Sequence, residues 1–391
     1  MPVTVSPRNW TLVSVVAFVL FVDYFLYGLV IPLTPLSPAN VKTEDQLGSL
    51  YATYAASVLV VTPIFGYLGD RLGARFMMLV GVGFALAATL LFGTAQNYGG
   101  LFLARLCQGA ASAAVWTSGL AIVAESYPER RVEMIGYAFT GSTLGSVFGP
   151  VVGGALYRFA GYQLPFLMVG AMVAVEAVLL MALLPRGPSA AHAKIDLPKL
   201  LGSKGVLVAA FAVALAALAW GIIEPLLPIH LDRAGVSAET IGLMFTVSSI
   251  LYGCSAPLVG WTSNRISVKR VIVLGTVLMA ATLPLLTLSD NALWVGIALC
   301  LVNVSFAFML NPAAAELANA TECVGLHCYS TVYAVYNIAY SIGMLATSAI
   351  ATGAGHIVGF AGALFAVSGV LIVSAFVLVA VNRGGRHVQG T

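Results

Sequence analysis

Long apolar runs recur along the whole chain, separated by short segments that hold most of its charged residues. Each run has about 20 residues or more, enough for an α-helix to cross roughly 30 Å of hydrocarbon. The pattern predicts an all-α membrane protein with no separate soluble domain. Twelve transmembrane helices are predicted, over residues 10–34, 46–68, 76–95, 99–125, 131–157, 163–184, 205–231, 238–263, 268–288, 291–319, 326–354 and 358–381.

The composition supports this prediction. Hydrophobic residues make up 60% of the chain and charged residues only 8%, whereas about a quarter of a soluble domain is charged. The net charge of +3 arises from the loops, so we expect no nucleic-acid partner. The cysteines and histidines show no metal-ligand spacing, so we expect no metal site and five free thiols: Cys107, Cys254, Cys300, Cys323 and Cys328.

Two segments of the chain resemble each other at a spacing of 194 residues. Residues 66–76 read GYLGDRLGARF and residues 260–270 read GWTSNRISVKR, and each closes an apolar run. The chain is therefore predicted to contain two six-helix halves, 1–184 and 205–391, joined by a cytoplasmic linker over 185–204. Repeated halves in a membrane chain are typical of alternating-access transporters.

Lysine and arginine residues are unevenly divided between the two sides of the predicted helices. With the N-terminus in the cytoplasm, fourteen fall in inside segments, and only Lys42, Arg158 and Arg233 fall outside. This bias follows the positive-inside rule. We expect a multi-pass protein of the plasma (inner) membrane with both termini cytoplasmic. The first helix is longer than a signal peptide and carries Asp23, so we expect it not to be cleaved.

Two acidic residues are predicted to lie at membrane depth. Asp23 falls near the middle of the helix over 10–34, and Glu224 comes directly before Pro225 in the helix over 205–231. A carboxylate at this depth is costly unless it faces water or a partner. Such an acid can hold a proton or a substrate ammonium but not both, as a proton/cation exchanger requires. The alternative is a structural acid that packs against a neighbouring helix or, at Glu224, an outer gate.

Arg105 is the one basic residue in the interior of a predicted helix. Arg105, Gln108, Ser112 and Trp116 are spaced by three, four and four residues, so they share one helical face. We expect this polar face to line the cavity, with Arg105 paired with an acid or relaying protons. If the substrate were an anion, Arg105 would be its best ligand. The alternative is a structural salt bridge.

A stripe of tyrosines follows the eleventh predicted helix. Tyr329, Tyr333, Tyr336 and Tyr340 recur every three or four residues, and Asn337 lies beside them. Aromatic faces and an amide suit a flat organic cation, through cation–π contacts and a hydrogen bond. The alternative is plain packing. Weaker candidates of the same kind are Tyr51 and Tyr54 in the second helix and Tyr24 and Tyr27 in the first.

Other charged residues lie in or beside the predicted helices. Glu176 falls at membrane depth in the helix over 163–184, where we expect it to snorkel or to contact a neighbouring helix. A further group is expected to form ion pairs that latch a cytoplasmic gate: Glu125, Glu129, Glu316, Arg71, Arg75, Arg130 and Arg131. Alternatively, these arginines only set the topology.

Three motifs resemble those of a known family. Residues 66–76 match the loop signature of the major facilitator superfamily between its second and third helices. Residues 105–109, RLCQG, match its second signature. Residues 141–154, GSTLGSVFGPVVGG, resemble the motif of its proton-coupled antiporters. The resemblance covers essentially the whole chain and implies two pseudo-symmetric six-helix halves.

The resemblance also implies roles for particular residues. Asp70 matches the residue that latches the cytoplasmic side, at the positive N-terminal end of a helix in the other half. Arg71 and Arg75 stand beside it in the same motif. The glycines of the fifth helix allow a neighbouring helix to approach closely, and Gly149 with Pro150 permits a seal or hinge.

Within the superfamily, the chain is most similar to drug:proton antiporters and vesicular amine transporters. This similarity rests on Asp23, on residues 224–228, EPLLP, and on residues 330–337, STVYAVYN. The chain departs from the vesicular amine transporters at two positions. Asn337 stands where they carry an aspartate, and Tyr54 stands where they carry a lysine.

The leading hypothesis is a secondary active, proton-coupled antiporter that exports hydrophobic organic cations, drugs or amines. The alternatives are a proton-coupled transporter of a sugar or small carboxylate that uses Arg105, and a non-transporting sensor or scaffold on the same fold. The sequence has no phosphate-binding loop with Lys-Ser/Thr. We therefore expect no enzyme activity and no cofactor, with a proton gradient as the energy source. The expected partners are the substrate, protons and the lipid bilayer, around a monomeric protein.

Overall fold

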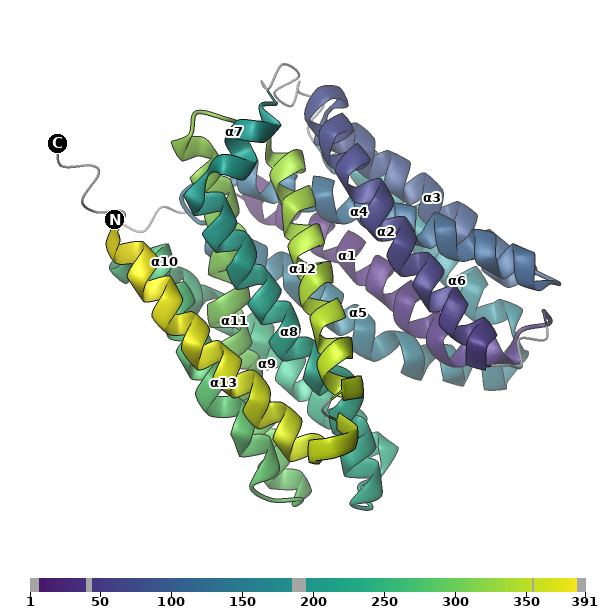
Figure 1. The fold of residues 1–391 in the computed structure, drawn as a ribbon. Coiled ribbons are helices and arrows are strands. Elements are labelled where there is room, and N and C mark those ends of the chain that lie inside the picture. Colours follow the sequence, from purple (N-terminus) through teal and green to yellow (C-terminus); the bar gives the residue numbers. More distant parts are fainter. Residues whose placement is uncertain (1–6, 40–43, 185–194, 354, 385–391) are drawn as a thin grey trace. The chain divides into compact units, whose positions relative to one another are not determined.

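The computed structural model describes residues 7–39, 44–184, 195–353 and 355–384. All regular secondary structure in these ranges is helical. The chain divides into two compact units, and Figure 1 colours their helices along the sequence.

The first unit contains residues 1–128, 137–196 and 326–337. Its helices are α1 (Pro7–Leu33), α2 (Glu44–Leu72), α3 (Ala74–Thr94), α4 (Tyr98–Ser126), most of α5 (Arg131–Ala160), α6 (Gln163–Leu183) and the start of α12 (Tyr329–Gly353), with a short 3-10 helix over Thr34–Leu36. Helix α4 is central: it packs against α1, α2 and α3, and all of residues 108–124 are buried. Alanine, glycine and serine are frequent there, which lets neighbouring helices approach closely.

The second unit contains residues 129–136, 197–325 and 338–391. Its helices are α7 (Leu197–Gly202), α8 (Lys204–Arg233), α9 (Ala238–Ile266), α10 (Val268–Thr282), α11 (Ala292–Cys323), the rest of α12 and α13 (Gly355–Gly384), with a 3-10 helix over Leu283–Thr287. Helix α11 packs against α8, α9 and α10, and residues 305–318 are buried. Its place in this unit matches that of α4 in the first, as a duplicated fold requires.

The all-helical membrane fold is confirmed, whereas the number of membrane crossings stays a prediction. In the part of the chain that the structure describes, twelve helices have 15 residues or more. Ten helical stretches are long and apolar enough to span a membrane, and α5 and α12 are not among them. Residues 129–136 and 326–337 each pack within the unit formed mainly by the other half of the chain. The predicted division into 1–184 and 205–391 also stays a prediction.

Glycines of α5 form a close contact with α1. Four of them recur every four residues, and a Cβ atom on each would collide with α1: Gly141 with Ala17, Gly145 with Phe21, Gly149 with Phe25 and Gly153 with Leu29. At Gly149 the added atom would lie 2.5 Å from the backbone oxygen of Phe25. The backbones of α1 and α5 therefore pack at a distance that larger residues would prevent. This confirms the close approach that the fifth-helix motif predicted, and it fixes the position of α1.

Candidate functional site

Asp23 lies on α1 inside the first unit, and its side chain is 8% exposed. Its Oδ2 atom accepts hydrogen bonds from Ser112 Oγ at 2.9 Å and from Trp116 Nε1 at 3.1 Å. Both donors come from α4, where they are four residues apart and share one face. The polar face of α4 that the sequence predicted therefore meets the carboxylate on α1.

Aromatic side chains surround this carboxylate. Tyr54 on α2 donates a hydrogen bond of 3.2 Å to Ser112 Oγ, which continues the network to Asp23. The rings of Tyr27 and Tyr54 lie 5.0 Å apart, and those of Tyr24 and Trp116 lie 5.4 Å apart. Tyr24 and Tyr27, which were weak sequence candidates, thus belong to the same cluster as Tyr54 and Trp116.

The start of α12 brings part of the tyrosine stripe to this cluster. The ring of Tyr336 stacks on Trp116 with centroids 6.4 Å apart, and Phe139 lies 5.9 Å from Tyr336. Tyr333 packs edge-on against Tyr336 at 6.3 Å, and both tyrosines are buried. Asn337 ends this segment with a half-buried side chain. Tyr340 is half-buried and belongs to the second unit, so the predicted stripe is divided between the units.

Arg105 is held by aromatic rings and an amide. Its side chain is 0% exposed, and its Nη1 donates a hydrogen bond of 2.9 Å to Gln108 Oε1. Its guanidinium lies 4.8 Å from the centre of the Tyr51 ring and 5.7 Å from that of Phe92. The ion pairs found among the described residues do not include Arg105. The expected pairing with an acid is therefore wrong, because aromatic faces supply the negative potential.

The two other intramembrane acids have opposite exposures. Glu224 on α8 has an exposed side chain, and it belongs to the second unit. Glu176 on α6 is 2% exposed, so it does not snorkel as expected. Helix α6 packs against α3 and α1, which agrees with the alternative of an interhelical position.

In the second unit, the buried hydroxyl of Tyr252 donates a hydrogen bond of 2.5 Å to Asn311 Oδ1.

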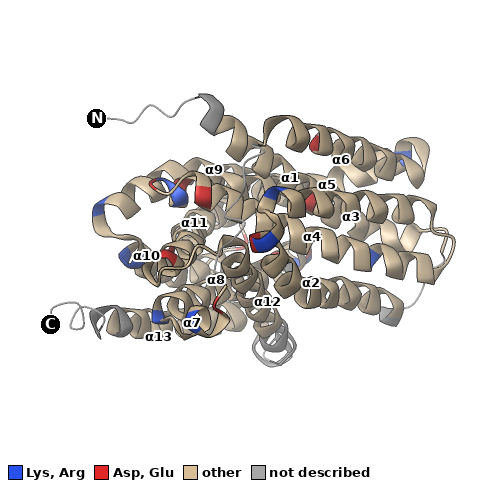
Figure 2. Ribbon diagram, turned by 90° about the horizontal axis from the view of Figure 1, so that it is seen from above, with Lys and Arg blue, Asp and Glu red and all other residues tan. Residues whose placement is uncertain are grey.

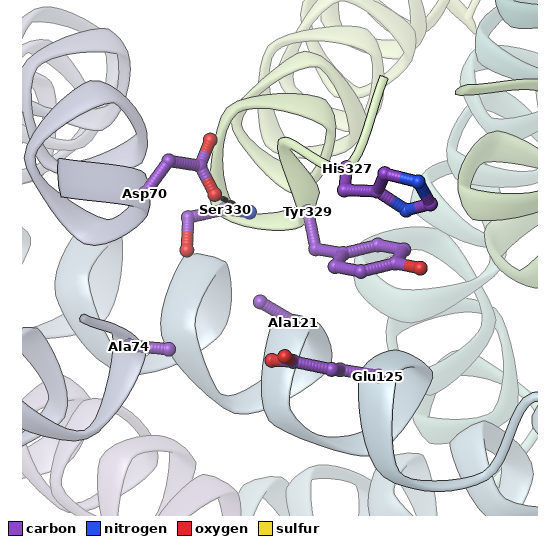
Figure 3. Close-up of a pocket in the computed structure, with 7 residues that line it drawn as sticks. All are labelled: Asp70, Ala74, Ala121, Glu125, His327, Tyr329 and Ser330. Carbon is purple, nitrogen blue, oxygen red and sulfur yellow. Dashed lines mark hydrogen bonds between the residues drawn. The ribbon is translucent and has the colours of Figure 1, made fainter. Parts of the chain in front are cut away.

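Asp70 binds the first turn of α12. Its Oδ1 and Oδ2 accept backbone hydrogen bonds of 2.8 Å from Ser330 and Thr331, respectively. A negative charge is favourable at this end of a helix because the backbone N–H groups there have no helical partner. The carboxylate borders a cavity of about 10 Å³, which Glu125, His327 and Tyr329 also line (Figure 3). This is the contact that the sequence predicted for Asp70, while its role as a gate stays a prediction.

The arginines next to Asp70 make contacts other than those expected. Arg71 lies over the Tyr67 ring at 4.7 Å, and Arg75 Nη2 donates a hydrogen bond of 2.9 Å to the backbone oxygen of Met181. Neither residue is in an ion pair within the described ranges. Their predicted ion pairing is wrong because an aromatic face and a carbonyl at the end of α6 take up these cations.

Ion pairs form instead in the second unit. Figure 2 colours the basic and acidic residues along the ribbon. Arg131 pairs with Glu322, and Lys269 Nζ lies 3.5 Å from Glu316 Oε1. Arg130, directly before α5, pairs at 2.6 Å with Glu133 in the first turn of that helix. Arg130, Arg131 and Glu316 thus take part in ion pairs, but the partners in these pairs differ from the expected ones, and the gate latch stays a prediction. Glu322, Glu133 and Lys269 were missed as partners, since the sequence does not show which helix ends meet.

Other residues of the site were also missed. Tyr51 and Phe92 hold Arg105, and Phe139 contacts Tyr336 and Trp116. The spacing of three between Tyr51 and Tyr54 on α2 was the available signal for Tyr51. Nothing in the periodicity distinguishes Phe92 or Phe139 from ordinary apolar packing residues. A larger groove of about 340 Å³ between α1 and α5 contains none of the predicted binding residues.

The sequence matches the Major Facilitator Superfamily twice, over residues 13–208 and 209–389. The chain belongs to this superfamily. It is therefore a multi-pass membrane protein of a transporter family rather than an enzyme. The double match also agrees with the repeated halves seen in the sequence.

Several relatives of this superfamily protein are vesicular transporters. It is 28% identical to the vesicular acetylcholine transporter of Homo sapiens over 81% of this chain and 61% of that protein. It is 30% identical to the rat (Rattus norvegicus) vesicular acetylcholine transporter over 81% of this chain and 62% of that protein. It is 28% identical to the human synaptic vesicular amine transporter over 84% of this chain and 68% of that protein. The chain thus spans about three fifths of the length of these human and rat vesicular acetylcholine transporters.

A solved structure supports the fold. The chain is similar to the crystal structure of the human organic anion transporter MFSD10 (TETRAN), with a TM-score of 0.72. The match covers 95% of this chain and 100% of the other, at 16% sequence identity. At this identity the likeness confirms the superfamily fold and does not extend to the substrate.

Proposed function

We propose that this protein is a secondary active antiporter that exports hydrophobic organic cations, such as drugs or amines, in exchange for protons. The observation that supports this most directly is the buried carboxylate of Asp23 among aromatic rings. A carboxylate that is buried in a membrane protein is costly and marks ion or substrate pathways. Aromatic faces around it favour a cation over an anion.

Exchange would occur at the free oxygen of Asp23. Both hydrogen bonds from α4 reach Oδ2, and we assign Oδ1 to the proton or the substrate cation. When the O–H bond breaks, the proton passes to water in the cavity and the carboxylate attracts the cation. When a proton returns, the neutral carboxyl group loses that attraction and the cation leaves. One group thus couples the two fluxes because it binds only one of them at a time.

The surrounding residues would select the substrate. Tyr24, Tyr27, Tyr54 and Trp116 present ring faces and edges around the carboxylate, and Tyr336 stacks on Trp116. Cation–π contacts of this kind contribute about 0.5–2 kcal/mol each, more when water is excluded. A hydrophobic ammonium would gain from several of them, whereas a small hydrated cation would lose its water without compensation. We also propose that Glu224 on α8, Asn337 and Tyr340 take part in proton or substrate binding.

The names of the relatives agree with this substrate class. Acetylcholine is a quaternary ammonium, and amines are protonated near neutral pH, so both are organic cations. We further propose that the protein is a monomer in the plasma (inner) membrane with both termini cytoplasmic. Asp70, bound to the start of α12, would hold the cytoplasmic side closed. Gly149 and Pro150 would form part of the seal between α5 and α1.

A second candidate is the transport of a sugar or small carboxylate through Arg105. It rests on buried donors: Arg105 Nε and Nη2 and Gln108 Nε2 have no hydrogen-bond partner among the described residues. An anion could accept hydrogen bonds from these groups. The first proposal remains preferred because the rings above Arg105 already neutralise part of its charge, whereas the Asp23 network is open at Oδ1.

Proteoliposomes with a trapped pH dye would test the proposal. Acid-loaded vesicles receive acetylcholine, a permanent cation that carries no proton, so any proton flux must pass through the protein. We expect proton release with acetylcholine and tetraphenylphosphonium but not with glucose or lactate. Asp23→Asn should abolish the release, whereas Glu239→Gln, which removes an exposed acid at the start of α9, should leave it intact.

A response to lactate or glucose alone, lost in Arg105→Gln, would favour the second candidate. No response to any compound in a protein that still binds tetraphenylphosphonium would point to the sensor or scaffold alternative. Normal exchange by Asp23→Asn would refute the role given to Asp23.

A further inference from the structure

Glu176 is the most deeply buried carboxyl group of the described residues. It lies on α6, which packs against α3 and α1, and its side chain is 2% exposed. No hydrogen bond or ion pair in the described ranges involves it. The proposed exchange at Asp23 makes no use of this residue, so its presence needs a separate account.

Burial without a partner decides the charge of Glu176. An ionised carboxylate in an apolar interior costs many kcal/mol unless it is paired, and such groups take up a proton instead. An apolar residue of similar size would fill the same space between α6, α3 and α1 without this cost. By this argument the neutral form of Glu176 is favoured in this state, and its proton can leave when water reaches the carboxyl group.

Glu176 lies on a helix that packs against the helix carrying Asp23. Because α6 contacts α1, an ionised Asp23 would add a like charge to the surroundings of Glu176. The other charged or titratable groups on the described parts of α1 and α3 are Tyr24, Tyr27 and Arg75. Arg75 is bound to the Met181 carbonyl, five residues beyond Glu176 on α6, and it forms no ion pair with Glu176. Asp23 is thus the group whose ionisation would act on Glu176.

We propose that Glu176 is a second proton-binding residue of the first unit, linked to Asp23 through like-charge repulsion. The idea rests on the proposed function and deepens it, since it adds a proton to each transport cycle. The O–H bond of Glu176 breaks when water reaches α6 in another conformation, and the proton passes to that water. It is restored when the unit closes, so that the two buried acids never carry two negative charges together.

Infrared spectroscopy of the purified protein tests proton binding without any transport. A protonated carboxyl group gives a carbonyl-stretch band that its ionised form lacks. We expect this band at neutral pH in the wild type and in Glu239→Gln, and its loss in Glu176→Gln. In Asp23→Asn the Glu176 band should titrate at lower pH than in the wild type, because one of the two repelling charges is gone. A merely structural role would not move that titration.

Proton release on cation binding gives the second readout. In weakly buffered detergent solution, tetraphenylphosphonium should release fewer protons per bound cation from Glu176→Gln than from the wild type, with cation affinity changed by less than about threefold. Melting temperatures identify a variant that has not folded, and Glu176→Asp, which restores a carboxyl group, should recover the band if the glutamine variant is unstable.

The outcomes separate the two ideas. If the wild type shows no proton release with any cation but Glu176→Gln loses the band, the proposed function fails and proton binding at Glu176 stands. If Asp23→Asn abolishes coupling while Glu176→Gln keeps both the band and the proton count, Glu176 is structural and the present inference is overturned.

Discussion

The two units have similar helix packing but differ in how deeply the acid on their first long helix is buried. In the first unit the acid on α1 is buried and held by Ser112 and Trp116 from the central helix. In the second unit the acid on α8, Glu224, has an exposed side chain, and Asn311 on the central helix α11 accepts a hydrogen bond from Tyr252 on α9. Duplication supplied the scaffold of both units, whereas the acid on the first long helix is buried in the first unit and exposed in the second.

The acids of the two units give the largest expected effect. Asp23→Asn should lower cation-driven proton flux on the order of 100-fold or more, because the variant removes the buried carboxyl group that binds the proton and the cation. Glu224→Gln should lower it on the order of 10-fold, because an exposed acid interacts through water. Flux is measured with the trapped pH dye at matched protein density. Equal effects at both positions would remove the proposed asymmetry.

Helix contacts give the next largest effect. Gly149→Ala should destabilise the protein by about 1–3 kcal/mol, since the new methyl group meets backbone atoms of α1. Gly154→Ala, five residues away with nothing within 4 Å, serves as the control and should be neutral or slightly stabilising. In the second unit, Gly343→Ala should behave like Gly149→Ala, because its methyl group would meet the Ala214 backbone of α8. Thermal unfolding in detergent measures all three, and equal melting temperatures for the two α5 variants would contradict the close packing.

The latch at Asp70 can be tested through Cys328, which is buried two residues before Ser330. Asp70→Asn loses the charge that binds two backbone N–H groups, a loss of about 1–3 kcal/mol. Cys328 should then react with a maleimide several-fold faster, as judged by peptide mass spectrometry. Exposed Cys323 in the same protein is the internal control.

The repeated segment offers a matched position for that test. Asn264 occupies the place of Asp70 in the second copy of the motif, and its side chain is exposed. Asn264→Ala should leave the labelling of Cys328 unchanged. Faster labelling in this variant as well would show that any loosening of the motif exposes the thiol, and the latch would lose its support.

Single hydroxyl groups should give the smallest effect. Tyr54→Phe removes the hydrogen bond to Ser112, worth about 1 kcal/mol, and should weaken tetraphenylphosphonium binding about fivefold. Tyr252→Phe removes the hydrogen bond from Tyr252 to Asn311 in the second unit. It should lower the melting temperature with little change in tetraphenylphosphonium binding. Binding is measured by calorimetry in detergent. The reverse pattern would place the cation in the second unit.

Much of this site followed from sequence periodicity. The spacing of Gln108, Ser112 and Trp116 placed them on one face, and Asp23 was notable as an acid in an apolar helix. The motif around Asp70 predicted its contact with a helix start, which the structure contains. These inferences succeeded because they depend on local geometry, which 3.6 residues per turn fixes, or on a motif shared by a large family.

The failures share a cause. The partners of Arg105, Arg71 and Arg75 were predicted from charge alone, yet the structure gives them aromatic rings, an amide and a carbonyl. A sequence shows which charges exist but not which surfaces face them. Glu176 was expected to reach the membrane surface for the same reason, and instead it is enclosed by α6 and its neighbours.

The sequence by itself determined the helical membrane fold, the repeat and the family, because apolar length, periodicity and motifs are properties of the chain alone. The tertiary structure decided that α4 would present its donors to Asp23, that rings would hold Arg105 and that Glu176 would be buried without a partner. Those outcomes depend on how helices far apart in the chain pack. That packing is set by small residues such as the α5 glycines at positions where many side chains meet.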